Sequence, residues 1–184
     1  ITHDLGLNHP MNRMLQGDVG SGKTVIAAYA AFAAIRSGYQ AAIMAPTEIL
    51  AQQHYLKLCQ LLEPAGLRIC LLKGSLSKKK KLQIAEQLKA GEFDLAVGTH
   101  ALIQESVEFA NLGLVVVDEQ HKFGVLQRQA LSRKSGTHLN CDVLLMTATP
   151  IPRTMSLTIY GDLDLSKLDE LPPGRQPIKS RCVP

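Results

Sequence analysis

The chain has 184 residues, of which 46% are hydrophobic and 20% are charged. This composition excludes an intrinsically disordered chain and is sufficient for the core of one domain. No apolar run approaches the roughly 20 residues that span a bilayer, so no membrane partner is expected. The net charge of +4 permits a nucleic-acid partner without requiring one. Four widely separated cysteines and six histidines without paired spacing predict reduced cytoplasmic thiols and no zinc.

The predicted elements alternate between strand and helix along the chain. Apolar runs predict strands at 13–16, 40–45, 68–72, 94–97, 112–117 and 142–146. Helices are predicted at 23–37, 48–62, 77–90 and 124–132, with another after Pro152. This alternation predicts an α/β fold with a mainly parallel sheet and helices on both faces. The proline-rich segment 171–184 is predicted to be a linker, which leaves 1–170 as the domain.

A glycine-rich segment follows the first predicted strand and opens the first predicted helix. Its residues match the pattern GxxxxGK[ST] and are Gly17, Asp18, Val19, Gly20, Ser21, Gly22, Lys23 and Thr24. Glycines let the backbone turn tightly, so that N–H groups and the positive end of the helix face phosphate oxygens. Lys23 adds a cation for the β- and γ-phosphates, and the Thr24 hydroxyl is suited to Mg²⁺. The segment therefore predicts a P-loop that binds a nucleotide.

A pair of carboxylates follows the apolar run at 112–117. If this run is a buried parallel strand, Asp118 and Glu119 emerge at its carboxyl end, where open α/β sheets bind ligands. An aspartate there is a suitable oxygen ligand for Mg²⁺, and a neighbouring glutamate can polarise an attacking water. Together with the P-loop, the pair predicts an NTPase.

Three other motifs also come directly after predicted strands. They are Ala45-Pro46-Thr47-Glu48, Gly98-Thr99-His100 and the segment 147–154. Thr47 and Thr99 fit ordinary N-caps, but a helix N-terminus can also hold a phosphate of a nucleic-acid strand. The four lysines at 78–81 open a predicted helix, and we interpret them as a solvated face.

Taken as an ordered series, these segments resemble motifs I, Ia, Ib, II and III of superfamily 2 helicases and translocases. The resemblance covers nearly the whole chain, and the segments 160–164 and 170–175 are most similar to the branched-DNA translocases of this superfamily. It implies a RecA-like P-loop NTPase domain that uses ATP and Mg²⁺ and acts on branched or duplex DNA.

The resemblance also implies roles for single residues. The P-loop would bind ATP through Lys23, while Thr24 and Asp118 would hold Mg²⁺. Glu119 would position the attacking water, and Gln120 and His121 would sense the γ-phosphate. The implied DNA contacts are Pro46, Thr47, Gly98, Thr99, His100, Arg128 and Arg153. For the two arginines, a surface ion pair fits equally well.

Further parts are implied outside this sequence. A second RecA-like domain would complete the ATP site with an arginine finger, and a wedge domain would engage the DNA junction. Because the sequence begins at Ile1, we expect a fragment of a longer protein. The resemblance implies a bacterial cytosolic protein that works at the nucleoid. Without the arginine finger of the second domain, the fragment is expected to hydrolyse ATP poorly alone. The alternatives are the motor of a transcription-repair coupling factor, an RNA helicase, and a nucleotide switch or binding module.

Overall fold

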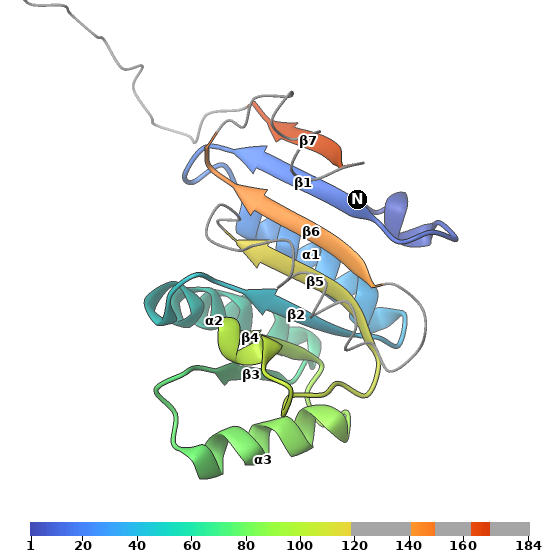
Figure 1. Cartoon of the computed structure of the whole chain (residues 1–184). Helices are drawn as coiled ribbons and strands as arrows, with labels where there is room; N and C mark the ends of the chain where they lie inside the picture. Colours follow the sequence, from blue (N-terminus) through green and yellow to red (C-terminus); the bar gives the residue numbers. More distant parts are fainter. Residues whose placement is uncertain (119–140, 150–162, 170–184) are drawn as a thin grey trace, which may run out of the picture.

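The computed structural model describes residues 1–118, 141–149 and 163–169. Within them, seven strands form one sheet in the order β3-β4-β2-β5-β6-β1-β7, and all the pairings are parallel (Figure 1). The strands are β1 (Asn12–Gly17), β2 (Gln40–Met44), β3 (Ile69–Leu72), β4 (Leu95–Gly98), β5 (Leu112–Asp118), β6 (Asp142–Thr147) and β7 (Asp164–Leu168). The predicted helices at 124–132 and after Pro152, and the predicted linker, lie outside the described residues.

Helices cover both faces of this sheet, which confirms the predicted α/β class. The α-helices are α1 (Lys23–Arg36), α2 (Glu48–Leu62) and α3 (Lys78–Lys89), and the short 3-10 helices are η1 (Asp4–Gly6), η2 (Glu63–Ala65) and η3 (His100–Ile103). Buried residues of α1 and α2 share one core cluster, whereas those of α3 and η3 belong to a second cluster. The sheet therefore lies between two layers (Figure 1).

The central strand β5 shows how the apolar runs are used. Leu114 and Val116 belong to the cluster that includes α1 and α2, and Val115 and Val117 belong to the cluster on the α3 side. Side chains alternate across a strand, so a strand buried on both faces needs a continuous apolar run. The same alternation places Asp118, which ends β5, on the face that α1 and α2 cover.

The edge strand β7 is absent from the elements predicted by sequence. It pairs with β1, and the Arg13 guanidinium ties the two strands together by contacts to Ser166 Oγ at 3.0 Å and to Asp164 Oδ2 at 3.3 Å. Its five residues include one aspartate and one lysine, and none of the five is fully buried. A short edge strand of this kind lacks the apolar run by which the other strands were predicted.

Gly98 ends β4 at a point where a side chain has no room. A Cβ there would collide with the Leu72 carbonyl oxygen and lie 3.0 Å from Leu102 Cγ. Backbone cannot move aside without disturbing the ladder between β3 and β4. This glycine was predicted as a DNA contact, and the fold alone supplies a packing reason for it.

We predict that Gly98→Ala lowers the free energy of unfolding by about 1–3 kcal/mol because the added methyl group overpacks the core. Urea denaturation followed by circular dichroism measures this change. Gly6→Ala is the matched control, since a Cβ at Gly6 has no atom within 4 Å. Equal stability of the two variants would contradict the packing argument.

Candidate nucleotide and nucleic-acid site

The predicted motifs gather at one edge of the sheet because its strands are parallel. The P-loop follows β1, Thr147 ends β6 and Asp118 ends β5. Pro46 and Thr47 follow β2, and Thr99 follows β4. In the strand order, β1, β6 and β5 are consecutive, and β2 and β4 come next. The edge therefore has a nucleotide half and a second half that holds the predicted nucleic-acid contacts.

The P-loop connects β1 to α1 by a tight turn. Gly22 is the N-cap of α1 and has a φ of 95°, a left-handed conformation that favours glycine. Lys23 Nζ donates hydrogen bonds to the carbonyl oxygens of Gly17 and Asp18, at 2.7 and 2.8 Å. The lysine therefore holds its positive charge over the loop itself, next to the N-terminus of α1. The lysine charge and the partial positive charge at the N-terminus of α1 both attract an anion such as a phosphate.

A buried hydroxyl in the P-loop fits this use of the loop. Ser21 Oγ is buried and has no hydrogen-bond partner among the described residues. It lies so close to Gly17 that a Cβ on the glycine would be 2.6 Å from it. Leaving a buried hydroxyl unpaired costs about 1–3 kcal/mol, which a phosphate oxygen accepting its hydrogen bond would offset. The loop is therefore compatible with a bound triphosphate.

Asp118 is held by a side chain that sequence analysis did not assign to the site. His54 Nε2, on α2, lies 2.7 Å from Asp118 Oδ2, and both side chains are 12% exposed. Asp118 and the hydroxyl of Thr24, at the second position of α1, are oxygen donors of the kind that Mg²⁺ prefers. The sequence signal for His54 was its position between Ala51 and Leu58, three and four residues away, on the buried stripe of α2.

The start of α2 is an ordinary capped helix with an additional anchor. Thr47 Oγ1 accepts a hydrogen bond from the Leu50 N–H at 3.3 Å, so the N-cap interpretation of Thr47 holds. Glu48 accepts hydrogen bonds from the Ser75 hydroxyl and the Ser75 N–H, at 2.6 and 2.8 Å. These bonds hold the pKa of the Glu48 carboxyl below its usual value. The first turn is thus fixed against the loop before α3.

Thr99 differs from Thr47 in the partner of its hydroxyl. Its side chain is 2% exposed, and Thr99 Oγ1 has no hydrogen-bond partner among the described residues. It is not a side-chain cap of η3, so the ordinary N-cap interpretation does not apply to it. The two buried hydroxyls without partners in the described ranges, Ser21 and Thr99, both belong to segments predicted to contact phosphates.

Thr147 lies between the P-loop and Asp118. It pairs with Gln16 of β1, and its neighbour Met146 pairs with Asp118. Thr147 is buried, and its hydroxyl accepts a hydrogen bond from the Thr149 N–H at 3.1 Å. Thr147, the first residue of this motif, therefore lies next to both the strand that leads into the P-loop and the strand that ends at Asp118.

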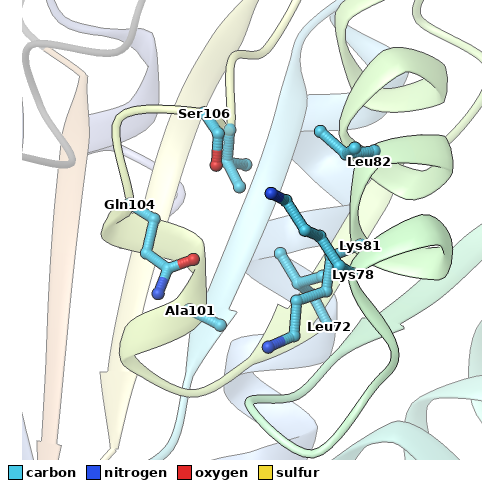
Figure 2. Close-up of a pocket in the computed structure, with 8 residues that line it drawn as sticks. Leu72, Lys78, Lys81, Leu82, Ala101, Gln104 and Ser106 are labelled. Atoms are coloured by element: carbon cyan, nitrogen blue, oxygen red, sulfur yellow. The ribbon is translucent and has the colours of Figure 1, made fainter.

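A pocket lies between α3 and the segment that follows β4, on the face of the sheet opposite to α1 and α2. It has a volume of about 290 Å³ and is lined by Leu72, Lys78, Lys81, Leu82, Ala101, Gln104, Ser106 and Val107. Figure 2 shows Lys78 and Lys81 extending from α3 toward the segment that carries Ala101, Gln104 and Ser106. Lys78, Lys79 and Lys80 are exposed, as the solvated-face interpretation predicts, and Lys81 is half-buried.

The remaining predicted site residues lie outside the described residues: they are Glu119, Gln120, His121, Arg128 and Arg153. Within the described ranges, no three metal-binding side chains are grouped as a zinc site requires. None of the helices described is long and apolar enough to cross a membrane.

The fold and the edge motifs together define a RecA-like P-loop NTPase domain. A family model described as DEAD/DEAH box helicase matches residues 5–157, so this chain belongs to the DEAD/DEAH box helicase family. The predicted superfamily is thereby confirmed.

Curated relatives show which helicases of this family the chain is similar to. The chain is 54% identical over 179 residues to the ATP-dependent DNA helicase RecG of Aquifex aeolicus and 56% identical over 183 residues to that of Synechocystis sp.. These matches cover 97% and 100% of this chain but 22% of each relative. The chain is also similar to a solved structure of RecG bound to a three-way DNA junction, with a TM-score of 0.77 and 46% identity over 95% of this chain and 23% of that one. The predicted similarity to branched-DNA translocases is confirmed.

We predict that Ser21→Ala in the complete parent chain leaves stability unchanged or slightly higher while nucleotide affinity falls about tenfold or more. Removing an unpaired buried hydroxyl costs the fold nothing, but a hydrogen bond to a charged phosphate is worth about 1.5–3 kcal/mol. Thermal unfolding and titration with a fluorescent ATP analogue measure the two effects.

Thr99→Val is the matched control, because it removes the other unpaired hydroxyl. It should leave nucleotide affinity unchanged and weaken binding of a DNA duplex. A Ser21→Ala variant that loses stability but keeps nucleotide affinity would show that the hydroxyl serves the fold.

Proposed function

We propose that residues 1–170 are the first RecA-like motor domain of an ATP-dependent branched-DNA helicase or translocase, and that 171–184 lead to the next domain. The observation that carries this proposal is the arrangement of the sheet edge. The P-loop and Asp118 occupy one half, while Thr47 and Thr99 occupy the other, within a single rigid sheet. The similarity to RecG bound to a DNA junction supports the choice of branched DNA.

In this proposal, the P-loop amides and Lys23 bind the phosphates of ATP. Lys23 can exchange its bonds with the Gly17 and Asp18 carbonyls for bonds to phosphate oxygens. Thr24 and Asp118 would hold Mg²⁺, which neutralises charge on the phosphates when bound. Glu119 orients the attacking water, and Gln120 and His121 pass the state of the γ-phosphate toward Thr147.

The nucleic-acid half would bind the sugar-phosphate backbone rather than the bases. Pro46 and Thr47 precede α2, whereas Gly98 ends β4, Thr99 follows it and His100 begins η3. The first turn of a helix leaves backbone N–H groups without helical partners, and such groups commonly contact phosphates. Aromatic residues make up 4% of the chain, which gives base stacking little support. Arg128 and Arg153 are proposed as further DNA or domain contacts.

The complete parent chain would supply the remaining parts. The relatives are over four times as long as the matched segment, since each match covers 22% of the relative. We propose that a second RecA-like domain completes the ATP site and that a wedge domain holds the junction. ATP would close the cleft between the two motor domains, and hydrolysis would reopen it. The proposed location is the bacterial cytosol.

The first experiment is ATP hydrolysis by the complete parent chain with forked DNA, linear duplex, single-stranded DNA or RNA. We expect the largest stimulation with forked DNA and its loss in Glu119→Gln, because this variant cannot orient the attacking water. Equal rates with every polymer, or no stimulation, would instead indicate a coupling-factor motor or a nucleotide switch. Stimulation by RNA alone would indicate an RNA helicase.

We also predict that Lys23→Ala in the parent chain lowers the hydrolysis rate by roughly 10²–10³-fold or more, since it removes a cation aimed at developing phosphate charge. Much of the junction binding should remain, as measured by gel shift. Lys57→Ala, at an exposed position of α2, is the control and should retain both properties. Retained turnover in Lys23→Ala would refute the role assigned to Lys23.

A further inference from the structure

One side-chain contact joins the two halves of the sheet edge. His54 belongs to α2, which starts at the proposed nucleic-acid contact, and Asp118 ends β5 in the nucleotide half. The 2.7 Å separation between His54 Nε2 and Asp118 Oδ2 is that of a strong hydrogen bond. The proposed function above assigns no role to His54.

The backbone arrangement directs both side chains into the same space. On α2, Ala51 and Leu58 are both 0% exposed, and His54 lies on their stripe at a spacing of three and four residues. On β5, Asp118 shares its face with Leu114 and Val116, which belong to the core cluster that includes α2. The helical spacing of α2 directs His54 toward the sheet, and the alternation along β5 directs Asp118 toward α2. The contact between the two side chains follows from these two patterns.

The chemistry of the two side chains determines which of them donates the hydrogen bond. A carboxylate only accepts hydrogen bonds, so His54 Nε2 carries the hydrogen. This bond fixes the Oδ2 atom of Asp118 and with it the rotation of the carboxylate, while Oδ1 takes no part in it. Carboxylates that bind metals are commonly oriented by such outer hydrogen bonds, and loss of the outer partner typically costs 10–100-fold in metal affinity or activity.

The helix that carries His54 is itself anchored. Glu48 is bonded to Ser75, and Gln52 Oε1 accepts a hydrogen bond from Lys73 Nζ at 3.0 Å. Thr47 and His54 are seven residues apart on one helix, or roughly 10 Å at 1.5 Å per residue. The imidazole is therefore held at a defined position relative to the start of α2.

We propose that His54 is a positioning residue that orients the Asp118 carboxylate for a divalent cation, so that α2 supports the metal site directly. The proposal rests on the role proposed above for Asp118.

The test uses the complete parent chain and needs neither DNA nor hydrolysis. A fluorescent, non-hydrolysable ATP analogue is titrated with Mg²⁺, and the concentration for half-maximal binding is measured. We expect His54→Phe, which keeps a ring but has no donor, to raise this concentration about tenfold or more. His54→Gln keeps an N–H donor and should restore most of the loss. Gln53→Phe places the same ring on the exposed side of α2 and should have no effect.

An unchanged Mg²⁺ requirement in His54→Phe would overturn the proposal. Equal losses in His54→Phe and His54→Gln, each matched by an equal loss of thermal stability, would overturn it as well, because they would indicate a packing role. If the larger ring of His54→Phe prevents folding, His54→Ala removes the donor without adding bulk and is judged by the same criterion.

Two further arms separate this inference from the proposed function. Asp118→Asn should raise the Mg²⁺ requirement at least as much as His54→Phe, and no effect would refute both the metal role and the inference. If the wild-type parent chain is not stimulated by forked DNA, the branched-DNA proposal fails. The Mg²⁺ titration would still decide the role of His54.

Discussion

The common direction of the strands is the constraint on which the rest of this protein depends. Because the paired strands are all parallel, the loop after β1, the end of β5 and the segments after β2, β4 and β6 meet at one edge. A reversed strand would carry its motif to the opposite edge, a full strand length away. Each motif is short, and the parallel sheet is what brings the motifs together at one edge.

Burial on both faces gives that edge its rigidity. The central strands alternate their side chains between two core clusters, so a shift by one residue would exchange all contacts on both sides. The same alternation determines which face Asp118 occupies, and hence that it meets α2 rather than α3. The position of the Asp118 carboxylate therefore follows from the packing of the apolar residues that precede it in β5.

Two side chains in the segments proposed to bind phosphates oppose stability. The buried hydroxyls of Ser21 and Thr99 have no partners in the described part of the chain. Leaving these hydroxyls unpaired costs free energy, which the large apolar core offsets. They occur where a ligand would supply the missing contacts, and this is typical of binding sites whose geometry is prepared before binding.

The sequence by itself determined the fold class, six of the seven described strands, the three described α-helices, the glycine-rich loop between β1 and α1, and the position of Asp118 at the end of a strand. It could do so because apolar periodicity and glycine spacing are local, and each reflects the backbone around it. The tertiary structure alone decided the strand order, the edge strand β7 and the partnership of His54 with Asp118. These depend on which surfaces pack together across the sheet, and residues 64 positions apart carry no local signal of their contact.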